Sequence, residues 1–367
     1  MKNKIRFAGM MVVVILWAAL AIFAWVRPSD ALSEAERRPL AQFPTLNADT
    51  LSSGIFMREF EDYTLDQFPA RDTFRQVKSL FHYRVLNQKD NNGIYITDGY
   101  AAKLDFPLNQ EALSYATGKL NQVYEKYLKS QGSNIYFAAI PDKGFYLAEK
   151  NGYPSMDYDR FFETLRQDLP WATHIDITDC LDISDYYFTD THWRQEQLFE
   201  VAEKISTSMN MPEPKPESYT QTPLERPFYG VYHGQAALPM EPETMYIMES
   251  SALKECRVYL YATDSYTDVY NMEKLTSKDL YDVYLSGTQS LVRIENPNAT
   301  TDRELIVFRD SFGSSLVPLL VSEYQSVTLV DIRYISSLLL NQYVDFRGQD
   351  VLFLYSTLVL NNGTSLK

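Results

Sequence analysis

Cysteine and histidine are scarce in this chain of 367 residues. Cys180 and Cys256 are far apart, and neither they nor the four histidines show the spacing of a C-x-x-C redox motif or of a zinc site. We therefore expect no metal and no other cofactor. The sequence leaves open whether the two cysteines form one disulfide outside the cell or remain separate thiols.

Basic residues are also few. The chain has 34 Lys and Arg against 48 Asp and Glu, a formal net charge of -14, and no basic patch stands out beyond the first residues. Binding to nucleic acid requires clustered Lys and Arg that neutralise phosphates. We therefore expect no nucleic-acid partner.

Glycine and proline are not in excess, and 45% of the residues are apolar, so the chain has the composition of a folded protein with one large domain or two ordinary ones. Aromatic residues are abundant, with 27 Tyr and 20 Phe. Sugar-binding surfaces often use such rings, although packing in a β-containing core is the expected use of most of them.

The N-terminus predicts a membrane anchor. Residues 1–6 (MKNKIR) carry three positive side chains, and residues 7–26 contain no charge over a length that spans a bilayer as a helix. The segment is longer than the apolar core of most cleaved signal peptides, and neither a convincing cleavage site nor a lipidatable cysteine follows it. We expect a single-pass anchor at 7–26, with 1–6 in the cytoplasm and the remainder outside.

The rest of the chain divides into five segments. Residues 27–50 predict a juxtamembrane linker, and 51–109 predict two amphipathic helices joined at Phe68-Pro69 and a hairpin about Asp98-Gly99. Apolar strands alternate with helices in 110–211 and again in 301–367, a pattern typical of a parallel sheet covered on both faces. The predicted core is an α/β three-layer sandwich, with 212–300 as an insertion or β subdomain between its two parts.

Ser311 is the candidate nucleophile. It follows an apolar strand in LIVFRDSFGSSLVPLL and precedes a predicted helix, so it lies at the sheet edge where ligands bind in open α/β folds. The backbone N–H groups of Ser311 and Gly313 are expected to face an oxygen that gains negative charge, and Gly313 lets the backbone approach the substrate.

Asp190 and His192 are the candidate acid and base. A serine hydroxyl needs a base to take its proton, normally a histidine held by a carboxylate. Asp190-Thr191-His192 supplies both groups from one loop. Either motif alone has an ordinary explanation, because D-x-H occurs by chance and a serine after a strand often caps a helix. Their occurrence at strand ends of one predicted sheet strengthens the hypothesis of a triad.

The chain resembles a known family in these motifs. DTHW and the later RDSFG, preceded by RRPLAQFP, EFEDYTLDQFPARD and GIYITDGY, are similar to the DHHW family of bacterial surface proteins and to the alginate O-acetyltransferase proteins, which have a permuted SGNH hydrolase-like fold. The resemblance covers most of residues 36–357. It implies that Ser311 is the nucleophile, His192 the base and Asp190 its partner.

The chain also departs from the SGNH pattern. Arg309 stands where these enzymes usually have glycine, and the Gly and Asn blocks that complete the oxyanion hole are not obvious. Arg333 is a candidate donor, although an ion-paired arginine after a strand is ordinary. Trp193 either stacks on a sugar ring or packs to fix the histidine loop. Lys143 either contacts substrate or is a solvated loop lysine.

The resemblance favours O-acetyl transfer to a cell-surface polysaccharide or cell-wall polymer, with the acyl group delivered by a membrane-bound O-acyltransferase partner. The same triad is also suited to ester hydrolysis. A third hypothesis is a non-catalytic glycan-binding or scaffold subunit. A metal-dependent hydrolase that uses Asp190 and His192 as ligands is a weaker alternative, because no third ligand has a recognisable spacing.

Overall fold

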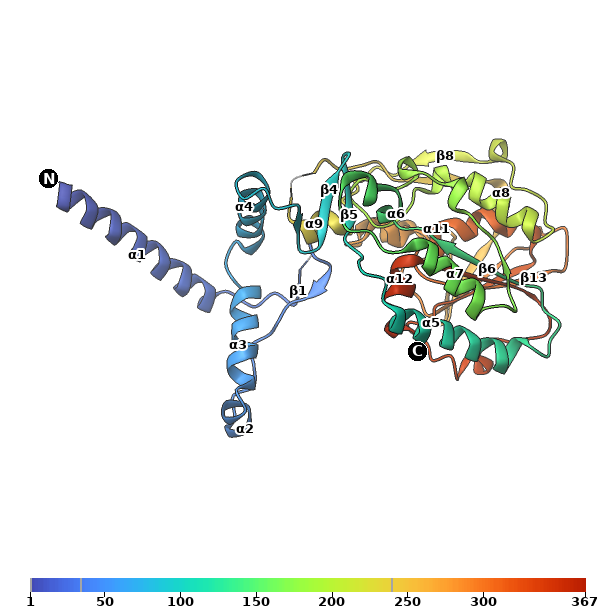
Figure 1. Cartoon of the computed structure of the whole chain (residues 1–367), viewed down its shortest axis with the longest axis horizontal. Helices are drawn as coiled ribbons and strands as arrows, with labels where there is room; N and C mark the ends of the chain where they lie inside the picture. Colours follow the sequence, from blue (N-terminus) through green and yellow to red (C-terminus); the bar gives the residue numbers. More distant parts are fainter. Residues whose placement is uncertain (1, 34, 239) are drawn as a thin grey trace. The chain divides into compact units, whose positions relative to one another are not determined.

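The computed structural model describes residues 2–33, 35–238 and 240–367 (Figure 1). The chain forms two compact units. The first consists of Met1–Asn92 and His233–Pro239, and the second of Gly93–Tyr232 and Met240–Lys367. The candidate triad lies entirely in the second unit.

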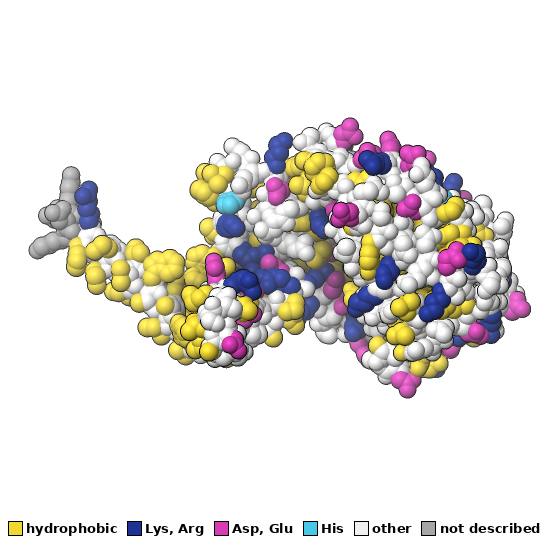
Figure 2. All heavy atoms as spheres, turned by 60° about the horizontal axis from the view of Figure 1, so that its bottom comes forward, with side chains coloured by type: hydrophobic (Ala, Val, Ile, Leu, Met, Phe, Trp, Pro, Cys, Tyr) yellow, Lys and Arg dark blue, Asp and Glu magenta, His cyan; other side chains and the backbone are white. Residues whose placement is uncertain are grey.

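The first unit begins with the long helix α1 (Lys2–Val26), whose apolar side chains are yellow in Figure 2. Its segment Arg6–Val26 is long and apolar enough to cross a membrane, a property that membrane anchors share with signal sequences. The two helices predicted around Phe68-Pro69 are present as α3 and α4. The elements after α1 are β1 (Leu32–Ser33), β2 (Arg38–Pro39), α2 (Ala48–Ser52), α3 (Ile55–Asp66), α4 (Arg71–Arg84) and β3 (Asp90–Asn91).

The second unit is built on an eight-stranded mixed sheet with the order β11-β10-β12-β14-β13-β15-β6-β7. The five strands from β14 to β7 are parallel, and the other three are antiparallel. The parallel strands are β6 (Ile135–Ile140), β7 (Thr173–His174), β13 (Glu304–Arg309), β14 (Ser326–Val330) and β15 (Asp350–Ser356), and the antiparallel ones are β10 (Arg257–Leu260), β11 (Ser265–Thr267) and β12 (Leu291–Glu295).

Both faces of the sheet are buried, because successive residues of the central strands belong to two different hydrophobic clusters. In β13, Val307 joins one cluster, and its neighbours Ile306 and Phe308 join the other. The first cluster contains α8 (Phe199–Ser208), and the second contains α5 (Gln110–Val123), α7 (Tyr158–Asp168) and α12 (Thr357–Asn361). The arrangement is three-layered, and the predicted α/β class is confirmed.

Most strands of the region 212–300 belong to the core sheet, because β10, β11 and β12 extend that sheet beyond β14. An antiparallel strand can be added to a sheet edge without the crossover helix that a parallel strand needs. A separate two-stranded ribbon is formed by β8 (Thr220–Pro223) and β9 (Tyr246–Glu249). This region also contains α10 (Ser251–Glu255) and α9 (Val231–Ala236), the latter beginning in the second unit and ending in the first.

Two local predictions can be compared with the structure. The hairpin is present as β4 (Ile94–Thr97) and β5 (Tyr100–Lys103), with positive φ at Asp98 and Gly99. One of the strands expected in 110–211 is very short: β7 ends at His174, because Asp176 accepts hydrogen bonds from the Thr178 N–H (3.0 Å) and hydroxyl (2.6 Å) and turns the chain.

Candidate active site

Ser311 lies two residues after the end of β13, on the turn that leads into the short helix α11 (Gly313–Leu316). The turn is held by Asp310, whose buried carboxylate accepts hydrogen bonds from the Ser356 N–H and hydroxyl, both at 2.7 Å, and from the Phe312 N–H at 3.0 Å. Ser356 ends β15, the neighbouring parallel strand. The turn is therefore fixed to the sheet edge from which the serine projects.

The loop of Asp190 and His192 comes before α8, and the structure brings it to Ser311. The His192 Nε2 atom lies 2.8 Å from the Ser311 Oγ, and its Nδ1 atom lies 2.5 Å from the Asp190 Oδ1. Asp190 and His192 are buried, and Ser311 is partly exposed. This is the order of contacts in which a carboxylate orients a histidine and the histidine takes a proton from a hydroxyl.

The Asp190 carboxylate is fixed from both sides. Its Oδ1 atom also accepts a hydrogen bond from the His192 backbone N–H at 3.1 Å, and its Oδ2 atom accepts one from the Val231 N–H at 2.7 Å. Gly230 packs so closely that a Cβ atom there would lie 2.3 Å from the Asp190 Cα. Only glycine fits at position 230.

Glu243 holds the residues just before Asp190. Its carboxylate accepts hydrogen bonds from the Phe188 N–H (2.8 Å), the Thr189 N–H (2.9 Å) and the Thr189 hydroxyl (3.1 Å). Burial raises the pKa of Glu243, while these three donors favour its charged form. The region 212–300 thus contributes directly to the site.

Tyr281 completes the surroundings of the histidine. Its ring stacks on the His192 imidazole with a centroid distance of 3.9 Å and an angle of 9° between the planes. Its hydroxyl lies 2.7 Å from the Ser315 Oγ. The residues 230, 231, 243 and 281 were not found from the sequence, which offered only a turn-rich segment of mixed pattern with no local sign of these contacts.

Trp193 packs against the serine turn. Its side chain is fully buried, and its Nε1–H donates hydrogen bonds to the Phe312 carbonyl (3.1 Å) and the Ser315 hydroxyl (2.9 Å). No ring face is open to a sugar in this arrangement. Of the two alternatives for Trp193, packing that fixes the histidine loop is the one that the geometry supports.

Lys143 is not the solvated lysine that its loop position suggests, because it is 2% exposed. Its ammonium donates hydrogen bonds to the carbonyls of Tyr187 (2.7 Å) and Phe188 (3.3 Å), in the loop that leads to Asp190. Burial lowers the pKa of Lys143 to about 7. Lys143 therefore supports the loop from inside the protein, and the expectation of a substrate contact has no support in its position.

Gly313 and Arg309 pack against each other, which accounts for the glycine at position 313. A Cβ atom at Gly313 would lie 2.9 Å from the Arg309 Cβ, so the glycine makes room for the buried arginine side chain. The Gly313 N–H also donates to the Asp310 carbonyl at 3.2 Å, so it is not the open oxyanion donor that we expected. Among the residues that the structure describes, the Ser311 N–H has no hydrogen-bond partner and remains the candidate donor.

Arg333 forms a two-point ion pair with Asp331, with Nε and Nη2 at 2.9 and 2.7 Å from its carboxylate oxygens. This ion pair is the ordinary alternative that the sequence left open. In the described ranges of the chain, no three His, Cys, Asp or Glu residues are grouped as metal ligands. Cys180 and Cys256 are free thiols.

The chain matches the family model described as "DHHW protein" over residues 184–330, a range that contains Asp190, His192 and Ser311. The resemblance to the DHHW family is thereby confirmed. No functionally curated protein sequence gives a match.

Several solved structures are similar. A DHHW family protein from Eubacterium siraeum has a TM-score of 0.60 at 20% identity, with 75% of this chain and 94% of that chain covered. Bacillus cereus PatB1 with a sulfonyl adduct has a TM-score of 0.58 at 19% identity, with coverages of 73% and 95%. The O-acetyltransferase domain of Pseudomonas putida AlgJ matches at 0.46 and 12% identity, with coverages of 73% and 92%. At these identities, the first two establish a shared fold.

Proposed function

We propose that the chain is a serine acyl-transfer enzyme in which Ser311 is the nucleophile, His192 the general base and Asp190 the orienting acid. The observation that carries the proposal is the continuous path from the Ser311 Oγ to the His192 Nε2 (2.8 Å) and from the His192 Nδ1 to the Asp190 Oδ1 (2.5 Å). A serine used only as a helix cap has no need of a buried histidine and carboxylate behind it.

The reaction then has two halves. The Ser311 Oγ attacks the acyl carbonyl while its proton passes to the His192 Nε2, and the Ser311 N–H faces the oxygen that gains charge. The leaving alcohol takes the proton from His192, and an acyl-serine remains. A second hydroxyl then loses its proton to His192 and attacks the acyl-serine, which releases the new ester and restores the Ser311 hydroxyl.

The acceptor that we propose is a hydroxyl of a cell-surface polysaccharide or cell-wall polymer, and the acyl group is acetyl. The resemblance to the alginate O-acetyltransferase proteins supports this choice. We further propose that α1 is an uncleaved anchor with its basic end in the cytoplasm, so that the site is extracytoplasmic. A membrane-bound O-acyltransferase partner would supply the acetyl group across the membrane.

The test uses the full chain in detergent, treated separately with p-nitrophenyl acetate and with phenylmethylsulfonyl fluoride. The solved PatB1 structure with a sulfonyl adduct motivates the second reagent, because an activated nucleophile forms such an adduct. We expect an acetyl and a sulfonyl mass shift on the wild type, no shift on Ser311→Ala and a greatly slowed reaction on His192→Ala. Ser130→Ala, at an exposed serine, is the matched control.

Each outcome separates the alternatives. Labelling of Ser311→Ala as fast as the wild type would contradict the assigned nucleophile. No adduct on any folded variant would favour the non-catalytic glycan-binding or scaffold subunit. If the acetyl-serine forms, adding oligosaccharide acceptors distinguishes transfer from hydrolysis, since a hydrolase releases acetate at the same rate with and without them.

A further inference from the structure

The first unit exposes apolar side chains on one face of α4. Phe74, Val77 and Phe81 are 51%, 59% and 51% exposed, and Val85, directly after the helix, is 59% exposed. Their spacing of three or four residues places them in one stripe along the helix. An exposed apolar stripe of this kind is typical of a surface that binds another protein or a membrane.

Aromatic rings continue this surface to the end of α1. The Trp25 ring lies 6.4 Å from the Phe43 ring, and the Phe43 ring lies 6.0 Å from Phe60 and 5.4 Å from Tyr63, both on α3. Clustered aromatic rings at the end of an apolar helix are typical of the boundary between lipid and water.

A second ring contact reaches further along α1. The Phe68 ring, between α3 and α4, lies 6.4 Å from the ring of Trp17. Trp17 precedes the last residue of α1 by two and a half turns, a distance of about 14 Å along the helix axis. The corner between α3 and α4 therefore lies beside the apolar part of α1.

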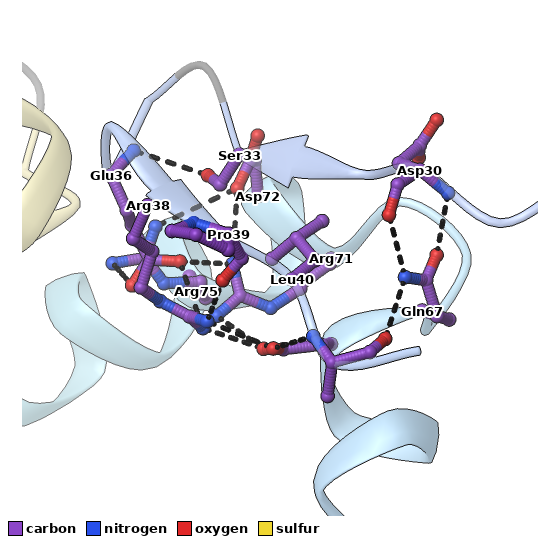
Figure 3. Close-up of polar contacts among 12 residues, drawn as sticks. Asp30, Ser33, Glu36, Arg38, Pro39, Leu40, Gln67, Arg71, Asp72 and Arg75 are labelled. Atoms are coloured by element: carbon purple, nitrogen blue, oxygen red, sulfur yellow. Dashed lines mark hydrogen bonds and ion pairs between the residues drawn. The ribbon is translucent and has the colours of Figure 1, made fainter. Parts of the chain in front are cut away.

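Hydrogen bonds tether this corner to the end of α1 (Figure 3). The Gln67 side chain accepts a hydrogen bond from the Asp30 N–H and donates one to the Asp30 carbonyl, both at 2.9 Å. Asp30 follows the last residue of α1 by so few positions that the chain between them spans at most about 14 Å. If α1 crosses a membrane, Gln67 cannot lie far from its surface.

Ion pairs make the tether stiff (Figure 3). The Asp66 carboxylate accepts hydrogen bonds from Arg38 (2.8 and 2.5 Å) and from the Ala41 N–H (2.9 Å). Glu36 pairs with Arg71 at 2.5 Å and with Arg75 at 3.1 Å, both on α4. Residues 27–50, expected to be a linker, are thus fastened to α3 and α4 by a buried or half-buried polar network.

The lining of the nearby hollow is amphipathic. A hollow of about 640 Å³ in the first unit is lined by the apolar Leu65, Phe68 and Phe74, the basic Arg71, Arg75 and Lys78, and the Glu36 carboxylate that pairs with the two arginines. Positive side chains beside an apolar stripe are typical of helices that lie at the surface of anionic membranes.

We propose that α3 and α4 lie at the level of the outer headgroups of the membrane that α1 crosses, with the stripe of Phe74, Val77 and Phe81 turned to the acyl chains. Phe68, between the two helices, reaches down to the acyl chains beside Trp17. The exposed Lys78 of α4 faces the lipid phosphates, while Arg71 and Arg75 stay paired with Glu36. This inference rests on the proposed membrane anchor. In this proposal, α3 and α4 of the first unit form a platform that rests on the bilayer. If residues 27–50 were only a flexible linker, these helices would lie in water.

The test is photocrosslinking of the full chain in vesicles of phosphatidylcholine and phosphatidylglycerol. Benzoylphenylalanine replaces Val77 or Phe81 in the stripe, Gln76 on the opposite exposed face of α4, or Val13 in the middle of α1. After irradiation, we expect the mass of one phospholipid to be added at Val77 and Phe81, and no addition at Gln76. Val13→benzoylphenylalanine reports on the anchor independently.

Lipid adducts at Val13 without lipid adducts at Val77 and Phe81 would overturn the platform and leave the anchor intact. Adducts to a second protein chain at Val77 and Phe81 would also overturn it, because the stripe would then be a protein interface. No adduct at Val13 would overturn the anchor itself. Equal lipid labelling at Gln76 and Val77 would show that α4 has no preferred face toward the bilayer.

Discussion

The turn of Ser311 and the loop of His192 are held in place in different ways. The serine turn is fixed by its own sheet, through the contact of Asp310 with Ser356 at the end of the neighbouring strand. The histidine loop is fixed mainly by residues that come later in the chain, with Glu243 holding its start and Val231 holding Asp190.

Because of this difference, we expect the Ser311 turn and the His192 loop to respond to different mutations. The region 212–300 can alter the position of the base without touching the nucleophile. Substitutions there are expected to change proton transfer while the Ser311 turn stays intact. The predictions below use that expectation, and each is measured by the rate of sulfonyl labelling of Ser311 unless another readout is given.

Asp190→Asn gives the largest expected effect. The carboxylate uses two acceptor oxygens, one for His192 and one for the Val231 N–H. The amide of asparagine has only one acceptor oxygen. If its NH₂ group faces the His192 Nδ1, the ring proton moves to Nε2, and if its NH₂ group faces the Val231 N–H, that N–H loses its acceptor. We expect the labelling rate to fall by about 10³- to 10⁴-fold. A rate within a few fold of the wild type would contradict the role of Asp190.

Gly230→Ala tests the tightest contact of the region 212–300 with the loop. The added Cβ would lie 2.3 Å from the Asp190 Cα, so the loop must move. Since a shift of about 1 Å at a catalytic group costs on the order of 10²-fold, we expect a loss of that size together with reduced stability. The control is Gly118→Ala on α5, where no atom lies within 4 Å of the added Cβ. Equal behaviour of the two variants would contradict the contact.

Glu243→Gln removes one acceptor from a residue that does not touch the triad. The glutamine oxygen can serve either Phe188 or Thr189, and its NH₂ group faces the other N–H. We expect a loss of about 1 kcal/mol in the free energy of unfolding, because one backbone N–H at the start of the loop loses its charged acceptor. Labelling should slow about tenfold through displacement of the base. Glu241→Gln, at an exposed position, is the control and should leave both quantities unchanged.

The candidate triad could be predicted from the sequence because its residues lie in two short segments, one with Asp190 and His192 and the other with Ser311. Ser311 follows an apolar strand, and Asp190 stands two positions before His192, so local patterns place them at strand ends. The parallel core could be predicted for the same reason. The hairpin turn at Asp98-Gly99 is also a local signal, since both positions need positive φ.

The support of the site could not be predicted because its contacts join residues far apart in sequence. Glu243 reaches Phe188 over 55 residues, and nothing around either residue indicates the other. Lys143 looks like a loop lysine, and its burial follows only from the packing of the completed fold. Likewise, the alternating pattern of β10 and β12 predicts strands but not the sheet edge that they join.

Lys143→Met gives the smallest effect and asks whether the support of the histidine loop titrates. Burial lowers the pKa of Lys143 to about 7, against an ordinary value of 10.5. Between these values the unfolded chain binds the extra proton, so this lysine makes stability rise with pH, by at most about 1.4 kcal/mol per pH unit. Urea unfolding of Lys143→Met from pH 7 to pH 10 should therefore show a flatter rise than the wild type. Exposed Lys103→Met should keep the wild-type slope. An equal slope in Lys143→Met would mean that the pKa of Lys143 is not lowered in the folded protein, so that the loop is held by an ammonium.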